Sequence, residues 1–96
     1  MNNDYERFND TAELLKALAH PVRLCIVKGL LDKGSCNVSF MQDCLGLPQS
    51  TVSQHLQKLR SMGIVTAHRN GLEVNYRVEN EKVKQLVEAF FGEETS

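Results

Sequence analysis

The sequence lacks the features that mark membrane, secreted and disulfide-linked proteins. No apolar run approaches the roughly 20 residues that a membrane-spanning helix needs, and the polar, acidic residues 1–10 are unlike a secretory signal. The cysteines form an odd, widely spaced set without a Cys-x-x-Cys pair, which is not the pattern of a disulfide scaffold: Cys25, Cys36 and Cys44. We therefore expect a cytoplasmic protein with reduced thiols and no membrane partner.

Catalytic groupings are missing as well. The chain has no Ser-His-Asp grouping with a supporting motif, no glycine-rich phosphate loop and no clustered carboxylates. We therefore predict that the protein is not an enzyme and carries no cofactor.

The length of the chain fits one domain. Its 96 residues are 42% apolar and 24% charged, which is typical of a globular protein. A chain of this size buries only about 65% of its unfolded surface, so dimerisation would supplement a modest core. We expect one domain over residues 1–96, frayed over 1–9 and 92–96.

The net charge of −1 conceals an uneven distribution. Residues 46–78 carry a net charge of +3, whereas residues 1–45 carry −1 and residues 79–96 carry −3. The distribution of charge matters more for nucleic-acid binding than the sum. The middle third is therefore the candidate for a nucleic-acid partner.

Local signals predict five helices. Asp10 and Glu13 have the spacing of a capping box, so we expect the first helix to begin at Asp10. Pro21 suits the first turn of a second helix that ends near residues 32–34, and Asn37 is a good N-cap for a third helix over 38–45. A fourth helix is expected over 48–62, closed by Gly63, and a last helix over 80–91.

A β-hairpin is expected between the last two helices. Asn70-Gly71, flanked by alternating residues 64–69 and 72–78, is a strong signal for a two-residue type I′ turn. That turn would pair Arg69 with Leu72, Ala67 with Val74 and Val65 with Tyr76 on a largely apolar face. His68 with Glu73, and Thr66 with Asn75, would then share the polar face.

Four helices, two strands and a last helix describe a mainly α fold with a small β-hairpin (α+β), a winged helix-turn-helix. In such a fold the fourth helix fits the major groove of DNA. Its exposed side chains form hydrogen bonds, and no carboxylate occurs between Gln49 and Arg60. The predicted DNA-facing residues of this helix are Gln49, Ser50, Thr51, Ser53, Gln54, His55 and Lys58. A module that binds protein through the same surfaces remains the alternative.

Residues 18–24, 45–56, 59–65 and 69–71 resemble the ArsR/SmtB family of bacterial repressors, and the resemblance spans nearly the whole chain. It implies a homodimer through the first and last helices that binds a palindromic double-stranded operator. Among the subgroups of the family, the chain is most similar to virulence-gene regulators that lack metal ligands. The implied dimer contacts are Leu14, Leu18, Val83, Leu86, Val87, Phe90 and Phe91.

The resemblance also assigns roles in DNA binding. Base readers would be Gln49, Ser50, Ser53 and Gln54, and the wing, His68 to Gly71, would contact phosphates through Arg69, Asn70 and Gly71. His55 would either contact DNA or brace the helix. Pro48 replaces the usual polar cap, which changes how the helix begins.

The resemblance leaves the effector open. Asn37 and Ser39 occupy the positions of the family's Cys-x-Cys metal ligands, and the last helix has no histidine, so we expect no metal site. Family persulfide sensors pair a cysteine at the position of Lys28 with one in the last helix, and neither cysteine is present here. Cys36 and Cys44 are candidates for a redox pair around the third helix. Cys25 would be a small buried residue, and its alternative role is that of a further redox thiol. A repressor without a small-molecule effector is the alternative.

Overall fold

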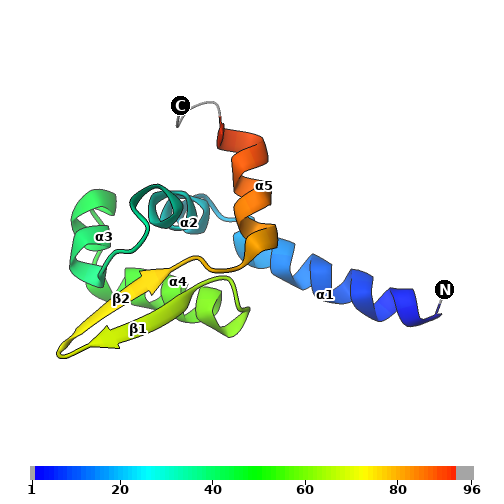
Figure 1. Cartoon of the computed structure of the whole chain (residues 1–96), viewed down its shortest axis with the longest axis horizontal. Coiled ribbons are helices and arrows are strands. Elements are labelled where there is room, and N and C mark those ends of the chain that lie inside the picture. The colour runs from blue at the N-terminus through cyan, green and yellow to red at the C-terminus, as the bar shows by residue number, and fades with distance from the viewer. Residues whose placement is uncertain (1, 93–96) are drawn as a thin grey trace.

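The computed structural model describes residues 2–92 and confirms the expected order of helices and strands. The elements, shown in Figure 1, are α1 (Asn2–Leu18), α2 (Pro21–Lys33), α3 (Val38–Leu45), α4 (Gln49–Ser61), β1 (Thr66–Asn70), β2 (Glu73–Arg77) and α5 (Glu81–Phe91). The fold is mainly helical with one antiparallel hairpin. The part of the expected C-terminal fraying that falls on residues 93–96 lies outside the described residues.

Helix α1 begins earlier than predicted. It starts at Asn2, so the expected start at Asp10 is wrong. No proline or glycine occurs before Pro21, and the intervening charged side chains are compatible with a helix, so nothing in the sequence interrupts it. Figure 1 shows α1 projecting from the rest of the molecule. Within residues 5–18 of this helix the buried side chains are Ala17 and Leu18, at its C-terminal end.

The other helix ends follow their capping residues. Asn37 Oδ1 accepts a hydrogen bond from the Phe40 amide at 2.9 Å, and Asn80 Oδ1 accepts from the amides of Lys82 and Val83 at 3.1 and 3.2 Å. Gly46 ends α3 in the left-handed conformation at φ +67°, with its N–H donating to Gln42 at 2.9 Å. Such a turn favours glycine because a Cβ is strained there. The Gly46 turn forms the short connection between α3 and α4.

The register of the hairpin differs from the prediction. Asn70 pairs with Glu73, Arg69 with Val74 and Ala67 with Tyr76, so the turn is Gly71-Leu72 and not Asn70-Gly71. All five predicted pairs are therefore wrong: Arg69–Leu72, Ala67–Val74, Val65–Tyr76, His68–Glu73 and Thr66–Asn75. On the polar face the observed pairs are His68–Asn75 and Thr66–Arg77. A type I′ turn needs positive φ at both turn residues, and only Gly71, at +67°, has it here. Each residue of β1 pairs with a β2 residue two positions later than predicted. Because side chains alternate between the two faces of a strand, a shift of two positions leaves each residue on its predicted face.

A third segment joins the hairpin. The Cys36 amide donates to the Tyr76 carbonyl at 3.2 Å, and the Tyr76 amide donates to the Cys36 carbonyl at 2.8 Å. Asn37 Nδ2 also donates to Glu73 Oε1 at 2.8 Å. These bonds attach β2 to the start of α3, so the wing is fixed to the helices.

The core is apolar and draws on all five helices and the segment before β1. Val27, Val52, Leu59, Ile64 and Val83 are completely buried. Across residues 5–92 no polar or charged residue is buried. The packing therefore holds α4 rigidly through one face. None of the described helices is long and apolar enough to cross a membrane.

Candidate nucleic-acid interface

Helix α4 presents a polar face to solvent. Its apolar stripe, Val52, Leu56 and Leu59, is buried against the core. Most of the predicted DNA-facing side chains are exposed, namely Gln49, Ser50, Ser53, Gln54 and Lys58, whereas Thr51 and His55 are partly buried. The exposed face has hydrogen-bonding and basic side chains and no carboxylate. This face can therefore approach an anionic partner without repulsion.

The first turn of α4 is closed by backbone alone. Pro48 occupies the N-cap and makes no side-chain capping bond. The amides of Thr51 and Val52 both donate to the Pro48 carbonyl at 3.1 Å. No acidic side chain lies in this turn. The positive end of the helix dipole is therefore not neutralised locally, which favours a phosphate nearby.

The partly buried His55 side chain contacts two residues outside α4, Arg23 and His20. Arg23 Nε donates to His55 Nδ1 at 3.1 Å, and Arg23 Nη1 donates to the Ala17 carbonyl at 3.3 Å. The His20 ring lies edge-on to the His55 ring, 4.7 Å between centroids. Burial, the His20 ring and the Arg23 charge lower the pKa of His55 below its ordinary value of 6.5. Since Nδ1 accepts, a neutral His55 ties α4 to α2 and to the end of α1.

The tip of the wing is exposed. Arg69, Asn70 and Gly71 are open to solvent, and the side chain of Leu72 is fully exposed. Arg69 is followed by a turn in which only glycine has positive φ. The three residues predicted to contact phosphates therefore lie together at an accessible tip.

His68 differs from the other wing residues. Its Nε2 lies 3.0 Å from Glu79 Oε1 and 3.2 Å from Thr66 Oγ1, and the Thr66 hydroxyl donates to Glu79 Oε1 at 2.6 Å. The bond from Thr66, followed by that from His68, lowers the pKa of Glu79. His68 is thus engaged by the segment that leads into α5, whereas Arg69 lies on the other side of the strand.

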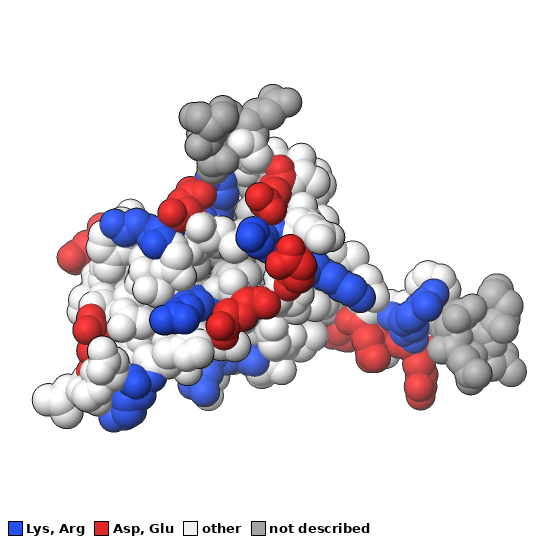
Figure 2. Space-filling model, viewed as in Figure 1, with Lys and Arg blue, Asp and Glu red and all other residues white. Residues whose placement is uncertain are grey.

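Basic side chains lie near α4 and the hairpin. Figure 2 shows lysine and arginine side chains along the lower edge of the view, where Figure 1 places these two elements. Residues 46–78 contain one acidic residue, Glu73, against two lysine or arginine residues in α4 and two in the hairpin. Glu73 is itself hydrogen-bonded to Asn37. The interface is therefore locally basic on a chain of net charge −1.

The predicted dimer residues divide into two groups. Leu18, Val83 and Val87 are buried in the protomer's own core. Phe90 is 75% exposed, and the partly buried group is Leu14, Leu86 and Phe91. Leu15, which belongs to the apolar stripe of the first helix, is exposed, and sequence reasoning missed two further exposed apolar side chains on α1, Tyr5 and Phe8. Their spacing along α1 was the available signal, and the expected start at Asp10 concealed it.

The cysteines are reduced and differ in exposure. Cys36 is buried, whereas Cys44 and Cys25 are exposed, so the expectation of a buried Cys25 is wrong. Cys25 is next in sequence to Ile26, which is buried. No group of three metal-ligating side chains occurs among residues 5–92, whose side chains the structure describes.

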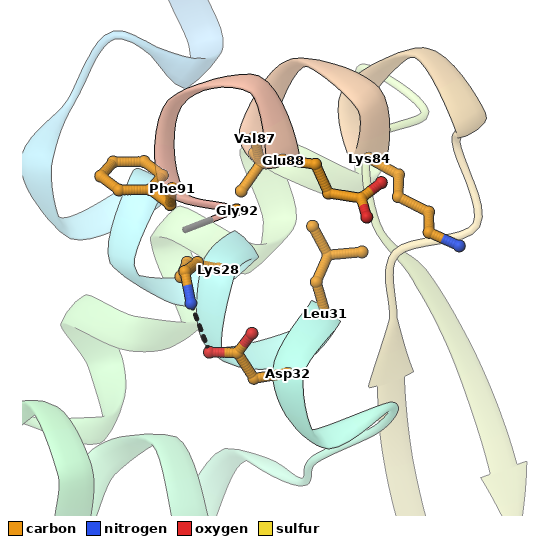
Figure 3. A pocket seen from close by; sticks show the side chains of 8 residues that line it. All are labelled: Lys28, Leu31, Asp32, Lys84, Val87, Glu88, Phe91 and Gly92. Atoms are coloured by element: carbon orange, nitrogen blue, oxygen red, sulfur yellow. Dashed lines mark hydrogen bonds and ion pairs between the residues drawn. The ribbon is translucent and has the colours of Figure 1, made fainter. Parts of the chain in front are cut away.

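A hollow of about 260 Å³ lies between α2 and α5. Figure 3 shows Lys28 of α2 paired with Asp32 at 2.6 Å, while Lys84 and Glu88 of α5 line the same hollow. This is the place where the resemblance puts the thiol pair of persulfide sensors. The eight residues that line it here include charged side chains and no thiol.

Comparisons with known proteins agree with this geometry. Residues 20–67 match the family model for bacterial regulatory proteins of the arsR family. Over 84 residues the chain is 45% identical to the transcriptional repressor PagR of Bacillus anthracis, covering 88% of this chain and 84% of that protein. It is 42% identical over 86 residues to the biofilm growth-associated repressor of Xylella fastidiosa, covering 90% of this chain and 75% of that protein.

Solved structures match over nearly the whole fold. The crystal structure of PagR superposes with a TM-score of 0.82 at 44% identity, covering 90% of this chain and 98% of that one. The homodimeric winged helix-turn-helix DNA-binding domain Mb0332 of Mycobacterium bovis gives a TM-score of 0.84 at 31% identity, covering 94% of this chain and 82% of that one. The fold is therefore a winged helix-turn-helix, and the chain belongs to the arsR family of bacterial regulatory proteins.

Proposed function

We propose that this protein is a homodimeric transcriptional repressor that binds a palindromic duplex operator. The observation that carries the proposal is the exposed face of α4, which has hydrogen-bonding side chains, no carboxylate and a rigid apolar attachment to the core. An α-helix of this kind fits the major groove, where the edges of the base pairs are distinguishable.

The side chains divide into two classes of contact. Gln54 and Gln49 can pair with adenine through two hydrogen bonds, and Ser53 can bond to a base or a phosphate. Arg69 and the backbone of Gly71 at the wing tip would contact phosphates, which positions the helix without reading sequence. His55 would brace α4 through Arg23, because its Nδ1 is already occupied.

The dimer supplies two copies of α4. PagR and the biofilm growth-associated protein are named repressors, and Mb0332 is described as homodimeric. Here Phe90, Phe8 and Tyr5 expose apolar surface on α5 and α1. Two-fold symmetry of the protein would then match two half-sites about one helical turn apart on the DNA. The chain would bind DNA as a single domain. The compartment in which it acts would be the bacterial cytoplasm.

In vitro selection from a library of random duplexes tests the proposal. We expect enrichment of an inverted repeat with half-site centres about 10 base pairs apart. Binding of the selected duplex should weaken steeply as salt rises. A library without enrichment, together with binding that salt does not affect, would favour a protein-interaction module.

A further inference from the structure

The three cysteines border one cavity. A space of about 110 Å³ lies between α2 and α3, away from the hollow between α2 and α5. Figure 1 shows these two helices at the end of the molecule opposite the N-terminus of α1. The walls combine three thiols with apolar side chains: Cys25, Cys36, Cys44, Ile26, Leu30 and Met41.

The thiols do not have equal access to solvent. Cys36 is buried and its backbone is paired with Tyr76. Burial raises the pKa of Cys36 more than the nearby Lys33 charge lowers it, which disfavours its thiolate. Cys25 and Cys44 are exposed and still line the cavity. Cys36 therefore forms an unreactive wall, and the other two thiols are within reach of a small molecule.

A positive charge lies at the surface edge of the cavity. Lys33, at the end of α2, places its Nζ 4.5 Å from the ring centroid of Phe40 on α3. Both residues line the cavity. An ammonium group stabilises an oxyanion that forms beside it.

The size of the cavity limits what it can hold. An apolar protein cavity of about 150 Å³ binds one benzene molecule. A cavity of about 110 Å³ therefore suits a single small ring. An apolar lining with two accessible thiols favours a neutral electrophile over a charged one.

We propose that this cavity is a covalent-modification site for small cyclic α,β-unsaturated ketones, with Cys25 and Cys44 as the reacting thiols. The thiolate sulfur forms a bond to the β-carbon while the π electrons of the double bond move to the carbonyl as an enolate. The enolate then takes up, at its α-carbon, the proton that the thiol gave up. No oxidant is required, and the product is a thioether.

The reaction would also affect the DNA-binding helix, a consequence that rests on the proposed function. Cys44 lies two residues before Gly46, the left-handed turn residue between α3 and α4. A ring held by the thioether bond to Cys44 cannot settle freely in the space between α2 and α3, so accommodating it would shift α3. Since α3 packs on α4, the adduct would weaken DNA binding.

The site itself is tested without DNA, with 2-cyclopentenone as the probe. Mass spectrometry of the intact protein and of its peptides would follow adduct formation with time at several enone concentrations. Gly29 provides a blocking variant, because it lines the cavity and a Cβ there would meet nothing within 4 Å. Gly29→Leu would fill the cavity, and Gly29→Ala is the matched control.

We expect the rate of labelling to saturate with enone concentration, as a binding site requires. Gly29→Leu should lower the rate at subsaturating enone by about tenfold, which corresponds to the loss of about 1.4 kcal/mol of binding. Gly29→Ala should react like the wild type, and the double variant Cys25→Ser/Cys44→Ser should form no adduct. The proposal would be overturned if the labelling rate rose linearly with enone concentration and matched the rate at which free glutathione reacts. It would also be overturned if Cys36 were labelled as fast as the two exposed thiols.

A random-sequence duplex then measures the consequence for DNA. The Cys44 adduct should bind it more weakly than the unmodified protein. If labelling is saturable but the adduct binds DNA as tightly as the unmodified protein, the modification site is supported and its effect on α4 is contradicted. Absence of DNA binding by the unmodified protein would instead contradict the proposed function.

Discussion

Replacing His55 by alanine is expected to destabilise the protein, because His55 is the acceptor that holds Arg23 between three helices. The bond from Arg23 Nε to His55 Nδ1 measures 3.1 Å and involves a charged donor. Hydrogen bonds to charged groups contribute about 1.5–3 kcal/mol when they are well shielded. Water can partly replace this acceptor, since the site is only partly buried. We therefore expect a loss of about 1–2 kcal/mol in the free energy of unfolding.

The lowered pKa of His55 adds a dependence on pH. A histidine with a depressed folded pKa stabilises the protein fully above its ordinary value of 6.5. That stability is lost as pH falls below 6.5 toward the folded pKa, because the unfolded chain then binds the proton more readily. His55→Gln keeps an acceptor for Arg23 but cannot titrate. It should therefore retain most of the stability at pH 7.5 and remove the His55 part of the slope below 6.5.

Thermal unfolding at fixed protein concentration measures both effects. For a domain of this size, each kcal/mol corresponds to about 4–8 °C in Tm. A fixed concentration matters because a dimer's Tm depends on it. If His55→Ala left Tm and its pH dependence unchanged while DNA affinity fell, His55 would be a DNA contact and not a brace.

Three further predictions concern other parts of the chain. Thr66→Val should raise the pKa of the Glu79 carboxyl toward its ordinary value of 4.5, because the bond from the hydroxyl is its main stabiliser; an unchanged NMR titration would contradict this. Gly46→Ala should lower the free energy of unfolding by about 1 kcal/mol because residue 46 has φ +67°, whereas Gly29→Ala, in a regular helix, should not lower it; equal denaturant midpoints for the two variants would contradict the assignment. Light scattering at micromolar concentration should give twice the chain mass of 10.8 kDa, and Phe90→Glu should shift the protein toward the monomer; a wild-type monomer would refute the dimer.

Local signals were sufficient to predict most of the fold. Asn37, Asn80 and Gly46 act within a few residues of their own position, so their roles could be read from the sequence. The start of α1 could not be predicted, because the capping-box spacing of Asp10 and Glu13 lies within a continuous helix. The hairpin turn was misplaced by one residue, since Asn70 does not adopt the positive φ that a type I′ turn requires.

The polar face of α4 was predictable because the buried stripe of Val52, Leu56 and Leu59 defines the opposite face. Contacts between residues far apart in the sequence could not be predicted. Arg23 and His55 lie 32 positions apart, and nothing near either residue indicates the other. The same holds for Cys25 and Cys44, which come to one cavity only when α2 and α3 pack. Burial of Leu18 and Val83 within the protomer likewise depends on the packing of α1, α2 and α5.

The central claim is that α4 reads sequence while the wing grips the backbone. The most direct measurement compares Gln54→Ala and Arg69→Ala in their affinities for the selected duplex and for a scrambled one. Lys82→Ala, a loss of one exposed positive charge on α5, is the control.

We predict that Gln54→Ala lowers the discrimination between the two duplexes by about 1–3 kcal/mol. Arg69→Ala should weaken both complexes equally and reduce the salt slope by about one unit, and Lys82→Ala should change neither. The same uniform loss of affinity for Gln54→Ala and Arg69→Ala would contradict the assignment of sequence reading to α4.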